Sequence, residues 1–158
     1  MGSFRWLQFS DLHSGLKSFN ASTIRQQLLK FLEEKKFDCD AVFITGDVAN
    51  QGNYDEDTIV FIRNMLGKIT LSNAEHIYWA VGNHDIKRDI RFRKQLITEI
   101  RSDNNPTVKF EEFAGNEEDR SVLTSLAMKD YTVYYEKILG RSLSNEAVVK
   151  TCSPYVCQ

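Results

Sequence analysis

The first half of the chain alternates short hydrophobic runs with longer stretches in which apolar residues recur at helical spacing. The runs at residues 4–9, 41–45 and 76–81 are each closed by polar or glycine residues, which predicts three strands. Between these runs, helical spacing predicts helices over residues 24–36 and 55–69. The pattern therefore predicts an α/β fold with a β-α-β-α-β order.

The pattern changes after Asp89, where only helical spacing can be recognised with ease. We therefore divide the chain into a β-α-β-α-β core over residues 1–85, a helical insert over residues 86–150 and the start of a further part over residues 151–158. The expected helical stretches of the insert are residues 90–100, 122–128 and 131–139, and residues 147–152 are a weak strand candidate.

Polar side chains follow each of the three predicted strands. Strands that alternate with helices of this length are parallel, and such sheets bind ligands outside the carboxyl ends of their strands. All three polar segments are thus expected at one edge of the sheet. They are Asp11-Leu12-His13, Gly46-Asp47-Val48-Ala49-Asn50 and Gly82-Asn83-His84-Asp85.

The residue types in these segments suit a divalent cation. Asp11 and His13 are two residues apart and can point the same way, which offers one cation an oxygen and an imidazole nitrogen. Asp47 has two carboxylate oxygens and can bridge two cations, and Asn83 offers a neutral amide oxygen. Ligation by oxygen and nitrogen without thiolate suits Mn, Fe, Zn, Ni or Mg, and leaves the choice among them open.

The three segments differ in how strongly they indicate this chemistry. An aspartate after a strand is more often a turn former or helix cap, and a single loop histidine is usually only solvated. A four-residue word such as Gly-Asn-His-Asp at positions 82–85 is different, because it arises by chance in roughly one chain of this length per few thousand. This word is the strongest functional signal in the sequence.

In this order, the three segments resemble the N-terminal half of the calcineurin-like metallophosphoesterase family, over residues 4–85. The resemblance implies half of an α/β sandwich with a helical insert after the third strand, and two metal ions that hydrolyse a phosphate mono- or diester. Asp11 and His13 would hold the first metal, Asp47 would bridge both, and Asn83 would bind the second. His84 would act on the leaving oxygen of the substrate, and Asp85 would orient His84.

The resemblance also implies ligands that these residues do not include. The family completes its two metal sites with three further histidines, whereas this chain has three histidines in total. His76 begins the third predicted strand, at the end opposite the ligands, and is expected to be structural. We therefore expect a fragment of a longer enzyme, weak or inactive alone, whose uncovered apolar surface favours a homodimer through residues 86–158.

Composition and charge narrow these expectations. The chain has 158 residues, 42% hydrophobic and 27% charged, which is typical of one soluble globular domain. Its formal net charge of −2 gives no general attraction to nucleic acid or anionic lipid. No apolar run approaches the roughly 18 residues of a membrane helix, and the N-terminus lacks a signal-peptide pattern. We expect a cytoplasmic protein without a membrane span, whose three cysteines are free thiols.

A basic cluster between Lys87 and Lys94 offers an alternative function. Its five cations could guide an anionic substrate or contact nucleic-acid phosphates, so that the chain would serve as a non-catalytic metal-binding or regulatory module of a larger protein. The simpler interpretation, which we favour, is a solvated helix face paired with the acidic stretch Glu111–Asp119. The members of the cluster are Lys87, Arg88, Arg91, Arg93 and Lys94.

Overall fold

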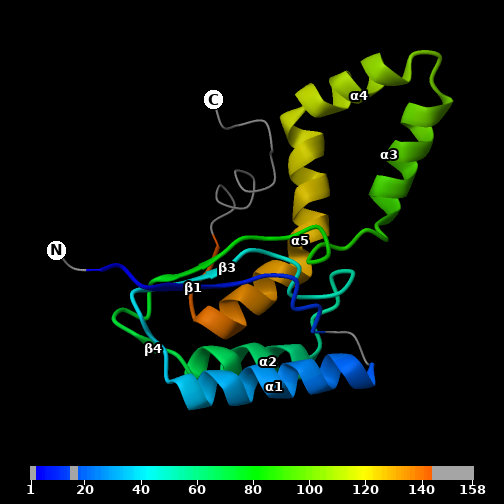
Figure 1. The fold of residues 1–158 in the computed structure, drawn as a ribbon. Helices are drawn as coiled ribbons and strands as arrows, with labels where there is room; N and C mark the ends of the chain where they lie inside the picture. Colours follow the sequence, from blue (N-terminus) through cyan, green and yellow to red (C-terminus); the bar gives the residue numbers. More distant parts are fainter. Residues whose placement is uncertain (1–2, 15–17, 144–158) are drawn as a thin grey trace.

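The computed structural model describes residues 3–14 and 18–143 of the chain (Figure 1). Its central sheet consists of three parallel strands, β1 (Trp6–Phe9), β3 (Ala41–Ile44) and β5 (Ile77–Trp79), in the order β1-β3-β5. The register places the C-terminal residues of the three strands side by side. The predicted parallel arrangement is confirmed, and all three following loops leave from one edge of the sheet.

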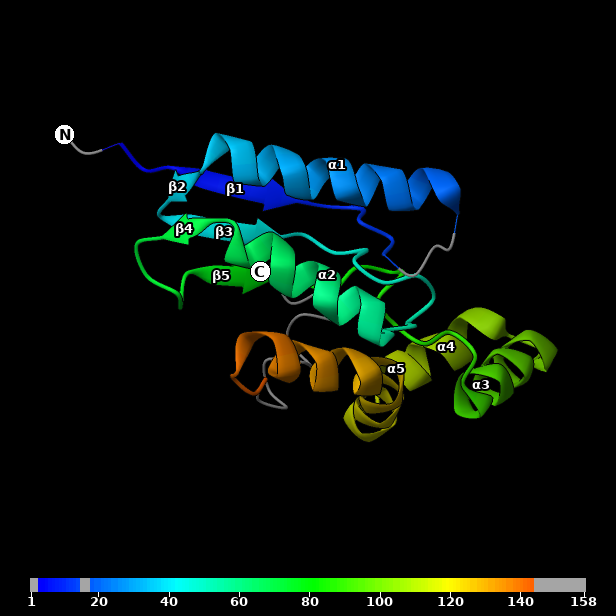
Figure 2. The ribbon, with the colours of Figure 1, turned by 90° about the horizontal axis from the view of Figure 1, so that it is seen from below.

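Three helices cover one face of this sheet, as Figure 2 shows. Helix α1 (Phe19–Lys35) packs on α2 (Glu56–Gly67), and α2 packs on α5 (Glu117–Leu139). Apolar side chains from the sheet and these helices are buried between the two layers, and this burial is the main source of stability for the fold. The most completely buried members are Leu32, Val42, Ile44, Ile62, Met65 and Met128.

The other face of the sheet is open to solvent along an aromatic row. The rings of Trp6 and Phe43 meet edge to face at 5.8 Å, and those of Phe43 and Tyr78 stack at 5.2 Å. Trp6 is 53% exposed and Tyr78 is 51% exposed. The expected apolar surface on the sheet is therefore present in the described residues.

Two short strands were not anticipated from the sequence. Strand β2 (Asp38–Cys39) pairs in parallel with β4 (Thr70–Leu71) as a separate two-stranded sheet. Strands of two residues are too short to give an alternating pattern of apolar and polar side chains, so sequence periodicity cannot detect them. They lie away from the strand ends that concern function.

The chain after β5 is helical, as expected, but its divisions differ from the prediction. Besides α3 (Arg91–Ser102), the structure contains α4 (Pro106–Gly115), which was not predicted. The segments 122–128 and 131–139, expected as separate stretches, form one helix, α5, that ends as predicted at Gly140 with φ +67°. The strand candidate at 147–152 lies outside the described residues.

Helices α3 and α4 contain no buried residue and extend away from the sheet, whereas α5 runs back to it (Figure 1). Asn105 accepts from the N–H of Val108 and Pro106 follows it, which explains why α4 begins there. In the described part of the chain, no helix has the length and apolarity that a bilayer crossing requires.

Candidate metal centre

The loops after β1 and β3 run side by side beyond the sheet. The N–H groups of Asp11 and His13 donate to the carbonyl oxygens of Gly46 and Asp47, at 3.2 and 3.0 Å. Ser14 continues the pairing by donating to Val48 at 2.8 Å. These backbone bonds place the two predicted ligand segments next to each other, although more than 30 residues separate them in sequence.

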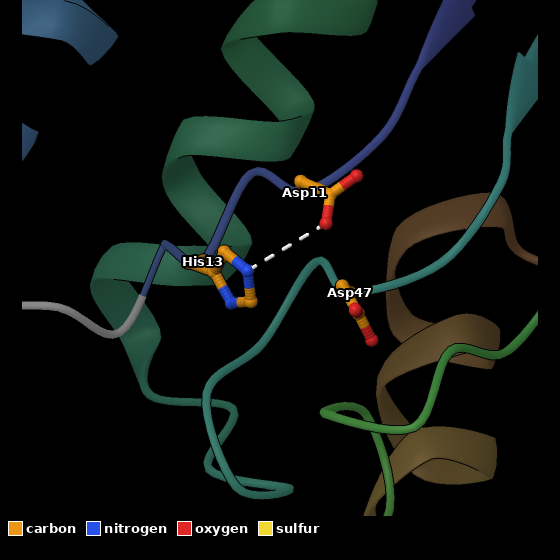
Figure 3. A group of neighbouring side chains, drawn as sticks. All are labelled: Asp11, His13 and Asp47. Atoms are coloured by element: carbon orange, nitrogen blue, oxygen red, sulfur yellow. Dashed lines mark ion pairs between the residues drawn. The ribbon is translucent and has the colours of Figure 1, made fainter.

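Asp11, His13 and Asp47 converge at this edge of the sheet (Figure 3). Each residue offers one ligand atom, and these atoms all lie within 4.8 Å of one another. The His13 imidazole Nε2 is 3.8 Å from a carboxylate oxygen of Asp11. Two carboxylates and an imidazole form a mixed oxygen and nitrogen donor set, which suits the divalent cations expected from the sequence.

All three of these residues have a left-handed backbone. The φ angles of Asp11, His13 and Asp47 are +54°, +41° and +54°, and the preceding Gly46 has φ +98°. Left-handed residues other than glycine cost roughly 1–2 kcal/mol each relative to the right-handed form. Three of them at one site indicate that the surrounding hydrogen bonds, and not local preference, determine the loop conformation.

Two glycines allow the loops after β3 and β5 to touch. A Cβ atom built on Gly46 would lie 2.7 Å from the Cα and the backbone nitrogen of Gly82, closer than atoms can approach. The positive φ of Gly46 agrees with the sharp turn expected there, whereas Gly82 is required for close approach to Asp47. This contact brings Asn83 to the Asp47 side of the site.

The Asn83 side chain lies directly beside Asp47. With the amide oriented so that its donor and acceptor atoms are both satisfied, its nitrogen donates to the two carboxylate oxygens of Asp47 at 3.1 and 3.2 Å, and its oxygen accepts from Nη2 of Arg88 at 2.6 Å. Asn83 is therefore within reach of the Asp47 side of the cluster. A half-turn of the amide would present its oxygen to a cation held by Asp47, so the donor set at this point fits a divalent ion.

His84 is fixed beside the ligand cluster. Its backbone N–H donates to Oδ1 of Asp47 at 2.8 Å, and its ring meets the ring of His13 edge to face at 4.9 Å. The Nδ1 atom is buried and has no hydrogen-bond partner among the described residues. The backbone bond and the ring contact thus hold the imidazole against the cluster, with Nδ1 shielded from solvent.

Asp85 is buried and connects the loop after β3 with the loop after β5. The residue is 1% exposed, and its two carboxylate oxygens accept from the backbone N–H groups of Ala49 and Gly82, both at 2.8 Å. Neither bond reaches the imidazole of His84, so the implied role of Asp85 in orienting that ring stays a prediction. Its observed contacts hold the segments that contain Asp47 and Asn83 together.

Tyr54 and Arg88 belong to this neighbourhood but were not identified as site residues from the sequence. Burial and the Asp85 carboxylate raise the pKa of Tyr54 above its ordinary range, so this hydroxyl stays protonated. Arg88 donates from Nε and Nη2 to the backbone oxygen of Asn83 at 3.2 and 3.0 Å. For Arg88, membership of the basic cluster was the sequence feature that could have indicated a role at the site. For Tyr54, the sequence pattern contained no such indication.

The remaining candidate residues lie elsewhere. The Nδ1 atom of His76 is 2.9 Å from the backbone oxygen of Asp40, at the end of the sheet opposite the ligands, as expected for a structural histidine. In the basic cluster, Lys87 pairs with Asp130 at 2.5 Å and Lys94 pairs with Asp89. Those two ion pairs use carboxylates outside the stretch Glu111–Asp119 that we expected as partner.

A parallel sheet with helices between its strands, and an Asp-His-Asp cluster at its carboxyl edge, define a metallophosphoesterase-like domain. The chain belongs to the Calcineurin-like phosphoesterase family, whose sequence pattern it matches over residues 4–147. The match confirms the resemblance seen in residues 4–85 and extends it through the helices that follow.

One similar protein is the uncharacterized metallophosphoesterase-like protein YydB of Bacillus subtilis (strain 168). It is 30% identical to this chain over 139 residues, which are 86% of this chain and 28% of that protein. The chain thus spans little more than a quarter of the length of this relative. No solved structure matches the chain.

Proposed function

We propose that the chain is a catalytic domain that hydrolyses phosphate mono- or diesters with two divalent metal ions. The observation that supports this proposal is the convergence of Asp11, His13 and Asp47 from two loops, with ligand atoms within 4.8 Å of one another. Family membership supplies the reaction class, since the family is one of phosphoesterases.

Four side chains would hold the metals. Asp11, His13 and Asp47 would form the first site, and Asp47 together with the adjacent Asn83 amide would form the second. Mn, Fe, Zn, Ni and Mg all suit this donor set. Two bound divalent ions supply a water of lowered pKa and offset the negative charge that develops on the phosphoryl group.

His84 would supply the proton for the leaving oxygen. Its backbone is anchored to Asp47, and its ring lies against His13, so the imidazole is close to any phosphate held at the ligand cluster. Because Nδ1 is buried, the Nε2 edge of the ring is the one that we assign to the substrate. Proton transfer by a positioned side chain contributes about 10²- to 10⁴-fold to a rate.

The test combines metal binding with hydrolysis. Calorimetric titration of the chain with Mn²⁺ should show binding that is lost or weakened at least tenfold in Asp47→Asn, because this change removes the charge shared by both sites. Asp57→Asn, an exposed carboxylate on α2, is the matched control and should bind Mn²⁺ like the wild type.

Hydrolysis of p-nitrophenyl phosphate and of bis(p-nitrophenyl) phosphate then separates the two functions considered for this chain. Manganese-dependent release of p-nitrophenol that disappears in Asp47→Asn would support the phosphoesterase. Tight Mn²⁺ binding without any hydrolysis, by this chain or by a longer natural form of the protein, would instead favour the non-catalytic metal-binding module.

A further inference from the structure

A cavity opens beside His84. Its volume is about 510 Å³, and the described residues that line it are Gln51, His84, Lys87, Arg88 and Asp89. Four of these residues come from the segment between β5 and α3, which passes α5 (Figure 1), where Lys87 donates its N–H to the backbone oxygen of Ala127. No predicted metal ligand is among these lining residues, whereas His84 both lines the cavity and contacts the cluster.

The position of His84 indicates which part of a substrate would occupy this cavity. A residue that protonates the leaving oxygen lies next to that oxygen, so the leaving group extends past the residue and away from the reacting phosphorus. The centroid of the His84 ring lies 4.9 Å from that of His13 in the cluster, and His84 also lines the cavity. The cavity is therefore placed to receive the leaving group.

The charges around the cavity indicate what kind of leaving group fits. Lys87 is paired with Asp130, and Asp89 is paired with Lys94, so the charges of both are offset. The Lys94 partner also holds the pKa of Asp89 below its usual range. Arg88 differs, because in the described structure its guanidinium donates to neutral oxygens of Asn83, the backbone oxygen and the amide oxygen, and to no carboxylate.

The lining thus contains one cation that has no carboxylate partner, and the described lining has no aliphatic or aromatic side chain besides the His84 ring. A guanidinium with donors to spare binds phosphate well, because its planar fork matches two phosphate oxygens. An anionic leaving group suits these surroundings, whereas an apolar one would gain little from them.

From these observations, and resting on the function proposed above, we propose that Arg88 binds a phosphate group on the leaving group of the substrate. The substrate class is a phosphate compound whose leaving group itself carries a phosphate, as in a diphosphate linkage, so the chemistry proposed above acts here on a phosphoanhydride in place of an ester. Water oxygen bonds to the terminal phosphorus and releases a proton to solvent, the bond from that phosphorus to the bridging oxygen breaks, and His84 gives its proton to the bridging oxygen. The products are inorganic phosphate and a phosphorylated leaving group, whose phosphate stays on Arg88; ADP, AMP and adenosine serve as probes.

A nucleic acid also presents a leaving group with further phosphates. A strand bound along the basic cluster would need several available cations in a row, because each phosphate contact adds to affinity. Lys87 and Lys94, at the two ends of the cluster, are already paired with Asp130 and Asp89. Arg91 and Arg93 belong to the cluster but do not line the cavity, so the described lining offers Arg88 as its one available cation and favours a small ligand with a single phosphate there.

Binding to the metal-free chain tests this inference without relying on activity. We expect AMP to bind by calorimetric titration in EDTA, adenosine to bind much more weakly, and Arg88→Gln to weaken AMP binding about tenfold or more. Arg91→Gln removes the same charge from an exposed position that does not line the cavity, and should leave AMP binding within about twofold of the wild type.

Equal effects of Arg88→Gln and Arg91→Gln on AMP would overturn the proposal, since they would indicate a general charge effect. The proposal would also be overturned if Arg88→Gln weakened the binding of an octathymidylate and left the binding of AMP unchanged, because that result would favour nucleic acid as the ligand. With Mn²⁺ present, Arg88→Gln should raise KM for ADP about tenfold while changing p-nitrophenyl phosphate kinetics within about twofold. If neither this chain nor a longer natural form of the protein hydrolyses ADP or p-nitrophenyl phosphate, the proposed function fails, while AMP binding still decides the role of Arg88.

Discussion

The strand-end loops and the arm formed by α3 and α4 are held in different ways. The loops contain buried residues, among them Val48, Ala49 and Asp85. The loops after β1, β3 and β5 are joined by backbone hydrogen bonds between segments far apart in sequence, such as His13 to Asp47 and Gly52 to His84. The arm contains no buried residue and relies on its own helical bonds and on end-to-end contacts with its neighbours.

This difference explains where conformational strain can be maintained. A left-handed Asp or His persists only where many surrounding contacts determine its conformation, and Asp11, His13 and Asp47 are all in such a place. In the arm, no described residue other than glycine has a positive φ. Single changes in the loops should therefore affect all predicted ligands together, whereas changes in the arm should remain local.

The largest difference in stability between the loops and the arm should come from adding one methyl group to a glycine in each. Gly46→Ala places a Cβ 2.7 Å from the backbone of Gly82 at φ +98°, and we expect a loss of more than about 3 kcal/mol of unfolding free energy, together with Mn²⁺ binding. Gly115→Ala, at the end of α4, meets nothing within 4 Å and should change stability by less than about 1 kcal/mol.

Urea denaturation followed by circular dichroism measures both variants. If Gly46→Ala is too unstable to purify, limited proteolysis of freshly expressed protein gives the same ranking. Equal stability of the two variants would show that the loops after β3 and β5 do not pack as closely as the structure has them.

The difference between local patterns and contacts made by distant loops also determines how much of the structure the sequence could predict. Strand order and the convergence of Asp11, His13 and Asp47 were predictable, because buried runs and the carboxyl ends of parallel strands are local patterns with a general geometric consequence. The close approach of Gly82 to Asp47 and the bonds of Asp85 to Ala49 and Gly82 were not. They depend on how two loops meet, which no single segment encodes.

The helices show the same limit. Helix α5 was recognised in part because Tyr131 and Tyr135 lie on its buried face, but α4 has no buried residue and thus no clear apolar stripe to detect. Its start, Asn105-Pro106, lies between the predicted helical stretches 90–100 and 122–128, where no element was expected. Those residues are instead the N-cap and first position of the unpredicted helix.

Within the site, His84→Ala should separate chemistry from metal binding. Because His84 is not among the metal ligands that we propose, Mn²⁺ affinity measured by calorimetry should stay within about threefold of the wild type. Hydrolysis should fall about 10²- to 10⁴-fold for esters with poor leaving groups, and less for p-nitrophenyl esters, whose leaving oxygen needs little protonation. Loss of Mn²⁺ binding equal to that of Asp47→Asn would contradict this division of roles.

The junction between the two regions should give an intermediate effect. Tyr131 of α5 donates its hydroxyl to the backbone oxygen of Trp79 at 3.0 Å, at the open edge of β5. Tyr131→Phe keeps the packed ring and removes this buried bond, so we expect a loss of about 1–2 kcal/mol in urea denaturation. Tyr134→Phe, on a partly exposed ring of the same helix, is the matched control and should change stability by less than about 0.5 kcal/mol.

The smallest effect should come from the arm itself. Phe110 in α4 is 55% exposed and α4 has no buried residue, so Phe110→Ser should change the unfolding free energy by less than about 1 kcal/mol in dilute protein. A homodimer through residues 86–158 would alter this outcome, because a ring buried between two copies would stabilise the protein more at higher protein concentration.

Melting temperatures of wild type and Phe110→Ser should therefore be compared at about 1 and 100 μM, since mass action makes a dimer's stability depend on concentration. A constant small difference indicates that α4 faces solvent, whereas a difference that grows with concentration places Phe110 in a contact between copies.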